Sequence, residues 1–540
     1  MLGILESLRV LQKQPVPPTD DQGARRSAPG WRNVTPAVAL VLAALGARLA
    51  WLAVTNYTFE DAFITFQFAR RLAEGLGFVY NPGEPIYGTT TPLFALLLAG
   101  WLKVFPGAVV AGARVFGLLS CAGGLAFTWG ALREAGVASR PRICALALLA
   151  ASDKLWRFDT GGMETPLLFC LMMAALYAQL RGWPVRAGVA AGLLLWTRVD
   201  SALWLAALVL AYLRERRRLP LGFVASSALT YAPWLVFASL RFGSVVPHTV
   251  TAKWVHYQMG IATSLSRSAG ELFAWISPFG AWEIPAFWQI ALAGATLLLA
   301  AWGARKASEK PGLSALWIFG LLEATRIVLV GATFEQRYFV PVLSTTLVLA
   351  GLGLAALLGR LADSLHAPGL WAAAAAAACA AAVFFAARGA PRFRESQSLG
   401  HERSLKAIGR WIDSHAPREA SVLLEPLGYA GYFANRRMID EVGLVSPQVL
   451  RLARQNFSRD SILFSRLLLS EIRPDYFVVH CDDAPRVFSG ASGPVLGDRY
   501  SRKAVINPAN FDPGEPLASD PSAWGHCYEI WARSLPLASP

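Results

Sequence analysis

A series of long apolar runs constrains this chain more than any other feature. The first covers residues 34–55, and the others cover residues 109–131, 143–151, 167–180, 185–196, 202–213, 219–240, 284–301, 313–330, 338–358 and 370–387. Of the 540 residues, 54% are hydrophobic and only 16% are charged, which is unusual for a soluble globular domain. A helix needs roughly 20 apolar residues to cross a bilayer, so the sequence predicts a polytopic α-helical membrane protein with about eleven transmembrane helices, several of them short.

The basic residues between the apolar runs predict which loops face the cytoplasm. With residues 1–33 as a cytoplasmic N-terminal tail, the connections on the same side contain Arg133, Arg181, Arg214 and Arg305. Cytoplasmic loops carry an excess of Lys and Arg, and this excess explains the net charge of +14 without a nucleic-acid partner. An odd number of spans then places everything after the last run on the outer face of the membrane.

The long apolar runs end near residue 389, and residues 389–540 are predicted to form a small extracytoplasmic α/β domain. The expected helices are residues 402–415 and 458–472, the expected strands are 421–424, 476–480 and 528–532, and residues 489–524 are expected to be mostly loop. Cys481 and Cys527 lie in this domain. They are predicted to form a disulfide if the domain faces an oxidising compartment.

The loop after the first run, residues 56–92, contains the carboxylate pair Glu60 and Asp61. Phe59, Phe63 and Phe66 recur at helical spacing and predict an interfacial amphipathic helix, while the short run 92–105 predicts a second interfacial or re-entrant helix. Acids at the mouth of a membrane helix are costly unless they are solvated, paired or used. The pair therefore has two interpretations: a helix N-cap, or a general base or divalent-cation ligand.

Further polar residues are predicted on the same side of the membrane. Glu164 stands before an apolar run, where it either caps a helix or takes part in catalysis. His248 and Lys253 are five residues apart and either hold a phosphate or are merely solvated.

Two arginines interrupt or border apolar runs on that side. Arg198 lies near Asp200, and Arg337 follows Glu335. Each arginine either binds an anionic headgroup or is an interfacial charge whose side chain reaches water. Because all these groups share one predicted face, they suit a reaction on a lipid phosphate.

Several of these segments resemble the motifs of bacterial GT-C class membrane glycosyltransferases, and in particular the terminal β-(1→2) arabinofuranosyltransferases and their proteobacterial counterparts. The resemblance covers about residues 34–480 and rests on short motifs in the same order. The matching segments are Glu60-Asp61-Ala62-Phe63-Ile64, Asn81-Pro82-Gly83-Glu84, Gly88-Thr89-Thr90-Thr91-Pro92, Gly162-Met163-Glu164-Thr165-Pro166, Arg198-Val199-Asp200, Pro247-His248-Thr249 with Ala252-Lys253, and Arg337-Tyr338-Phe339-Val340-Pro341.

The resemblance implies an enzyme of a bacterial cytoplasmic (inner) membrane, with its active site and C-terminal domain on the periplasmic side. It implies transfer of a sugar, arabinofuranose among the candidates, from a polyprenyl-phosphate carrier to a glycan, lipid or protein hydroxyl of the cell envelope. Asp61 would take the acceptor proton, and Glu60 would assist or bind a divalent cation. The residues expected to bind the donor phosphate are Lys253, Arg337, Arg198 and His248, and those expected to contact the substrates are Glu164, Asp200 and Thr249.

The chain departs from the family pattern at Glu60, where the family usually has Asp, and also at Thr90, Val199 and His248. Two alternatives use the same fold class: a protein O-mannosyltransferase-like enzyme and a lipid A-modifying transferase. A lipid or solute transporter is a third. It would predict two related halves with broken helices, and the sequence contains no such internal repeat.

Overall fold

The computed structural model describes residues 35–279, 286–331, 335–367, 370–456, 460–488, 496, 499–507 and 527–534, apart from a few side chains in two helices. The predicted cytoplasmic tail, residues 1–33, lies outside these residues, as does most of the predicted loop 489–524.

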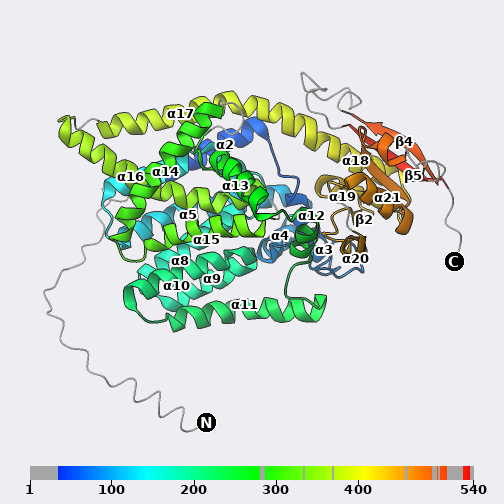
Figure 1. Ribbon diagram of the computed structural model, residues 1–540, viewed down its shortest axis with the longest axis horizontal. Coiled ribbons are helices and arrows are strands. Elements are labelled where there is room, and N and C mark those ends of the chain that lie inside the picture. The colour runs from blue at the N-terminus through cyan, green and yellow to red at the C-terminus, as the bar shows by residue number, and fades with distance from the viewer. Residues whose placement is uncertain are drawn as a thin grey trace, which may run out of the picture.

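A bundle of roughly parallel and antiparallel helices forms the larger part of the molecule (Figure 1). Each predicted apolar run overlaps one of its helices. They are α2 (Thr35–Thr55), α5 (Val109–Glu134), α6 (Ser139–Ala151), α8 (Thr165–Leu180), α9 (Pro184–Thr197), α10 (Ala202–Arg216), α11 (Leu221–Phe242), α14 (Ala286–Ser308), α15 (Ser314–Val330), α16 (Val340–Ser364) and α17 (Leu370–Phe393).

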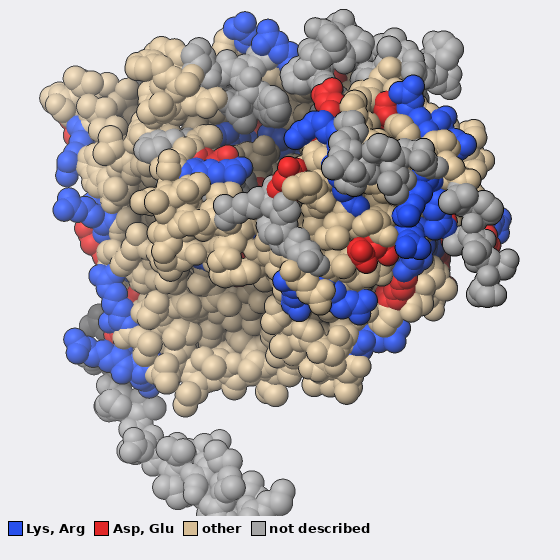
Figure 2. All heavy atoms as spheres, turned by 45° about the vertical axis from the view of Figure 1, so that its right-hand side comes forward, with Lys and Arg blue, Asp and Glu red and all other residues tan. Residues whose placement is uncertain are grey.

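Among the described residues, five helices are long and apolar enough by themselves to cross a membrane: α2, α5, α11, α14 and α16. The α8 helix adds a sixth if it is joined to α7 (Asp153–Thr160), from which it is bent by 106°. Large apolar side chains on these helices point outward, and Leu229 and Leu298 are 74% and 75% exposed. Figure 2 shows the same broad uncharged face, with Lys and Arg at the far end of the bundle and over the C-terminal domain. Such a surface is suited to lipid rather than water.

The α16 helix is the centre of the bundle, because 78% of its apolar segment is buried. Gly303 of α14 and Gly353 of α16 each lie against the backbone of the other helix, and Gly351 lies against the backbone of Ala145 in α6. Small residues let helix backbones approach closely. The start of α16, which directly follows Arg337 and Tyr338, is therefore held on a rigid support.

Shorter helices gather at one end of the bundle. The two helices predicted in and after the first loop are confirmed as α3 (Ala62–Ala73) and α4 (Pro92–Val104). The long connection between α11 and α14 contains α12 (His248–Tyr257) and α13 (Ile261–Ile276).

The C-terminal domain packs on this same end (Figure 1). Its five-stranded sheet has the order β2-β1-β3-β5-β4, parallel from β2 to β3 and antiparallel from β3 to β4. The strands are β1 (Ser421–Leu424), β2 (Arg437–Asp440), β3 (Tyr476–His480), β4 (Tyr500–Ile506) and β5 (Tyr528–Arg533). The helices are α18 (Glu402–His415), α19 (Gly428–Ala434), α20 (Pro447–Asn456), α21 (Ser461–Glu471) and α22 (Ala484–Phe488), and an eight-residue π-helix, η4 (Arg394–His401), joins α17 to α18.

The predicted strands at 421–424, 476–480 and 528–532 and the predicted helix at 402–415 are confirmed. The prediction that residues 489–524 are mostly loop is wrong for residues 500–506, which form β4. This strand lies at the sheet edge, where Arg502 and Lys503 are exposed, so it lacks a clear alternation of apolar and polar residues. Cys481 and Cys527 form a disulfide beside β3 and β5.

The sheet and the first loop share one hydrophobic core. Val422 and Leu424 of β1 belong to the cluster that contains Phe63 and Phe66 of α3, whereas Leu423 faces the opposite side of the sheet. Two of these strand residues therefore pack toward the bundle, so that the domain covers the loop that contains Asp61.

Candidate active site

A cavity of about 310 Å³ lies where α3, the α4 N-terminus, α12 and the start of α16 meet under the C-terminal domain. Its polar lining comes from loops that are far apart in the sequence. The predicted site residues that line it are Asp61, Glu164, Arg198, Asp200, Thr249, Lys253 and Arg337. The volume falls within the usual range for small-molecule sites.

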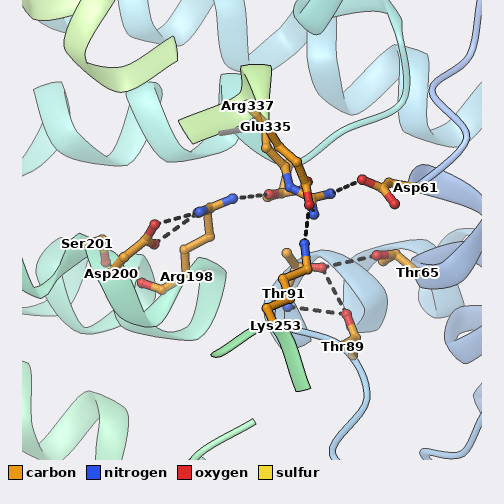
Figure 3. Close-up of polar contacts among 11 residues, drawn as sticks. Asp61, Thr65, Thr89, Thr91, Arg198, Asp200, Ser201, Lys253, Glu335 and Arg337 are labelled. Atoms are coloured by element: carbon orange, nitrogen blue, oxygen red, sulfur yellow. Dashed lines mark hydrogen bonds and ion pairs between the residues drawn. The ribbon is translucent and has the colours of Figure 1, made fainter. Parts of the chain in front are cut away.

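Asp61 directly precedes α3 and lies on the cavity wall, with its side chain 36% exposed. It stands at the N-cap position, but its carboxylate makes no capping hydrogen bond. Instead Arg337 Nη1 donates to Asp61 Oδ2 at 2.6 Å (Figure 3). Burial raises the pKa of Asp61, with a further contribution from the Glu335 carboxylate, while Arg337 and Lys253 oppose the rise. The residue is thus a carboxyl group with increased basicity, as a general base requires.

Glu335 joins the two cations nearest Asp61. Its carboxylate forms ion pairs with both Lys253 and Arg337. Burial tends to raise the pKa of Glu335, but the two cations outweigh this effect and lower it to about 2. Lys253 reaches this position because Thr249 and Lys253, four residues apart on α12, face the cavity together.

A second group of charged side chains lies at two breaks in the helices of the bundle. The bend between α7 and α8 contains Gly162, whose φ of +84° favours glycine, and it turns Glu164 into the cavity. The chain is extended at Arg198, between α9 and α10. Arg198 donates to Glu164 Oε1 at 3.0 Å and to both oxygens of Asp200 at 2.9 and 2.5 Å. The predicted capping role of Glu164 is not observed, because its carboxylate binds Arg198 instead.

Tyr338 lies among the cations of both groups. Arg198 lies 4.6 Å and Lys253 5.9 Å from the centre of its ring. Burial raises the pKa of the Tyr338 hydroxyl, but Lys253 and Arg337 outweigh it and the pKa is below its usual value. The face of the ring attracts these cations.

Threonine hydroxyls form another part of the cavity wall. Thr91 Oγ1 lies 3.3 Å from the Oγ1 atoms of both Thr65 and Thr89 (Figure 3). Gly88 lies next to this wall, and a Cβ there would come within 2.9 Å of Val445 Cγ1 and 3.0 Å of the Leu444 carbonyl oxygen, so a larger residue would force these groups to shift. Neutral hydroxyls facing a charged wall are suited to the hydroxyl groups of a sugar.

Two predicted site residues do not line the cavity. The carboxylate of Glu60 accepts a hydrogen bond from the backbone N–H of Gly428, in the C-terminal domain. His248 is half-buried, and its backbone N–H donates to the Tyr87 carbonyl at 2.9 Å. The position of His248 does not support the predicted phosphate contact, and Glu60 is suited to holding the domain on α3.

Sequence reasoning missed Glu335 and the role of Tyr338 among the cations. The signal was present, because Glu335 and Arg337 alternate with other residues in a short polar segment directly before an apolar run. Ionisable residues in membrane segments commonly pair with one another and mark functional sites.

Glu60 and Asp61, the two ligands that the sequence left open for a divalent cation, have different partners. Asp61 is paired with Arg337, and Glu60 is turned toward Gly428. Among the residues that the structure describes, no group of three or more His, Cys, Asp or Glu side chains could hold a metal ion.

The architecture is similar to that of solved membrane transferases. The crystal structure of ArnT from Cupriavidus metallidurans bound to undecaprenyl phosphate aligns with 94% of this chain and 99% of its own, at 18% identity and a TM-score of 0.56. The chain has the GT-C fold. The same ArnT in the apo state aligns with 91% of this chain and 97% of its own, at 14% identity and a TM-score of 0.58.

A third GT-C structure is the Archaeoglobus fulgidus oligosaccharyltransferase tethered to an acceptor peptide. It aligns with 94% of this chain and 75% of its own, at 14% identity and a TM-score of 0.56. At these identities the likeness establishes the fold alone. Residues 392–531 match a family described as a domain of unknown function, DUF8728. No curated protein matches the sequence.

Proposed function

We propose that this protein is an integral-membrane glycosyltransferase that uses a polyprenyl-phosphate-linked sugar. The observation that carries the proposal is the cavity in which the Asp61 carboxylate lies beside the cations Lys253 and Arg337. The GT-C fold is consistent with it, and one structure of this fold is bound to undecaprenyl phosphate.

In the proposed reaction, the bond between the sugar C1 and the phosphate oxygen breaks, and a bond forms between C1 and an acceptor hydroxyl oxygen. Asp61 accepts the hydroxyl proton, and polyprenyl phosphate leaves with the electron pair of the broken bond. Lys253 and Arg337 stabilise the charge on the departing phosphate, as preorganised cations do. Arg198 is nine-tenths buried and held by Glu164 and Asp200, so it supplies a fixed positive charge beside Tyr338.

We infer that the acceptor is a glycan, lipid or protein of the bacterial cell envelope and that the site faces the periplasmic side of the inner membrane. Arabinofuranose is the first sugar to test, on the strength of the sequence motifs. A lipid A-type acceptor and a protein acceptor are the alternatives. They share the same donor chemistry and differ only in what enters the cavity.

The direct test incubates the purified chain with radiolabelled decaprenyl-phosphoryl arabinose, or with the corresponding hexose donors, and envelope extract. Label should move into a glycosylated product, and Asp61→Asn should reduce transfer by about 10²- to 10⁴-fold, the usual contribution of a general base. Asp363→Asn is the matched control, because Asp363 is exposed near the opposite end of α16. If folded Asp61→Asn protein kept normal activity, Asp61 would not be the base.

A further inference from the structure

A second cavity, of about 670 Å³, lies on the other side of α3. Phe63 lines this second cavity, whereas the next residue, Ile64, lines the first. The two cavities therefore flank the first turn of α3 and are separated by its thickness. Nothing in the proposed transfer reaction uses the second cavity.

Basic side chains dominate the lining of the second cavity. They are Arg114, Arg394, Arg403, Lys406 and Arg410. Arg403, Lys406 and Arg410 follow the i, i+3, i+7 spacing of one helix face, so α18 presents a stripe of positive charge to the cavity. The π-helix η4 contributes Arg394, and π-helical segments occur frequently at functional sites.

Among the described residues that line this cavity, Glu402 is the single carboxylate. Glu402 is 7% exposed, and its Oε1 accepts a hydrogen bond from the Thr58 backbone N–H at 3.1 Å. Burial raises the pKa of Glu402 to about 8, against the opposing effect of that hydrogen bond, so the carboxyl group is mostly neutral at pH 7. In the described lining, five basic side chains therefore stand against one carboxyl group.

Apolar groups form much of the remaining wall, beside the polar residues Thr55, Asn56, Thr58 and Ser398. Aromatic rings come from Phe63, Trp411, Tyr429 and Phe433, and Lys406 Nζ lies 5.2 Å from the centre of the Phe433 ring. The cavity thus combines cations with a broad apolar surface. A ligand that matches both is anionic at one end and apolar at the other.

The position of the cavity indicates where such a ligand comes from. Thr55 and Asn56 at the end of α2, Val110 at the start of α5, and Arg394 just after α17 all line it. The α2 and α5 helices are both long and apolar enough to cross a membrane. Their ends mark the level of the membrane surface, where lipid headgroups lie.

We propose that the second cavity binds the phosphate-bearing headgroup of a membrane lipid, at a site separate from the donor phosphate. Lys406 and Arg410 contact the phosphate, and the aromatic wall contacts the upper part of the acyl chains. Basic pockets between membrane helices bind anionic lipid headgroups by the same chemistry.

The test counts lipids bound to the full chain in detergent by native mass spectrometry, with Lys253→Gln and Arg337→Gln present to disable the first cavity. The probes are dioleoyl phosphatidic acid, dioleoylglycerol with the same acyl chains, and inorganic phosphate. We expect one phosphatidic acid to bind, and Lys406→Gln with Arg410→Gln to weaken it at least about tenfold. Lys406→Arg with Arg410→Lys should retain binding, as should Arg418→Gln with Arg451→Gln, which removes two exposed arginines elsewhere in the same domain.

Three results would overturn the proposal. Equal binding of dioleoylglycerol would show that the apolar wall alone holds the lipid. Equal affinity for inorganic phosphate would assign the cavity to a soluble ligand. Unchanged binding in the folded Lys406→Gln, Arg410→Gln protein would remove the basic stripe from the site. Because the readout is binding and not transfer, none of these results depends on the proposed enzymatic activity.

Discussion

Opposite charges around Asp61 lead to a pair of opposite predictions for the pH dependence of activity. Arg337 lowers the pKa of Asp61, and Glu335 raises it, both against a background of burial that raises it. Arg337→Gln should therefore raise the pKa, and Glu335→Gln should lower it. A general base must be unprotonated, so activity falls as the pH drops below the pKa of Asp61. This loss should begin at a higher pH in Arg337→Gln than in the wild type, and at a lower pH in Glu335→Gln.

The size of the shift follows from the contact and its exposure. An arginine in contact with an aspartate lowers the aspartate pKa by about 1 to 3 units. The Arg337–Asp61 contact is 2.6 Å long, but the Asp61 side chain is 36% exposed, and solvent screens the interaction. We therefore expect a rise of about one unit in Arg337→Gln, equivalent to about 1.4 kcal/mol. Glu335→Gln should produce a fall of about half a unit to one unit.

The assay is the pH profile of kcat/KM for sugar transfer, which reports the ionisation of the free enzyme. Arg337→Gln will also lower the absolute rate, but the position of the acidic limb does not depend on that loss. Arg502→Gln is the control, because it breaks an ion pair with Glu529 on the sheet, away from the cavity. Acidic limbs that move in the same direction in the two variants, or that both stay in place, would refute Asp61 as the titrating base.

Three further predictions concern stability. Glu402→Gln should raise the melting temperature above that of the wild type at pH 8 but not at pH 4. The pKa of Glu402 is raised to about 8 in the folded state, so the wild type loses stability as the pH rises from the pKa of the unfolded state toward about 8, and glutamine avoids this loss. Equal melting temperatures of the two proteins at both pH values would contradict this. Arg198→Met should destabilise the protein by about 3 to 5 kcal/mol in denaturant unfolding, because it leaves the buried Glu164 carboxylate without its partner; adding Glu164→Gln should recover part of the loss, and no recovery would argue against the pair as its cause. Gly428→Ala should loosen the C-terminal domain and speed its proteolysis, because a Cβ there would overlap Glu60, whereas Gly389→Ala, which has open space, should not; equal cleavage rates in the two variants would argue against tight docking at Gly428.

The sequence allowed much of the bundle to be predicted because each helix carries its own signal. Apolar runs indicate α2 and α5 without knowledge of their neighbours, and Asp61 and Lys253 stand out as polar residues between such runs. Local pattern also sufficed for the strands β1 and β3, which are buried and apolar.

What the sequence did not reveal depends on contacts between distant residues. Glu60 binds the backbone of Gly428, which lies 368 positions later, and no local signal points to that partner. The same holds for Glu335, whose importance appears only once Lys253 is brought to it by α12. The number of spans is a similar case, because helices such as α6 and α9 have 13 and 14 residues and their depth in a membrane depends on their neighbours.

The docking of the C-terminal domain on the first loop has a consequence for protein engineering. Asn81 behaves like an extra residue of the sheet, since its side chain donates to the Met438 carbonyl at 2.9 Å and accepts from the Met438 N–H at 3.0 Å. Tyr80 donates to the Leu427 carbonyl, and Glu60 holds Gly428. A chimera joined after α17 would therefore separate the C-terminal domain from the first loop, to which it is hydrogen-bonded. The portable module is the terminal domain together with residues 56–91, so a swap between homologues that keeps this interface intact has to transplant both pieces at once.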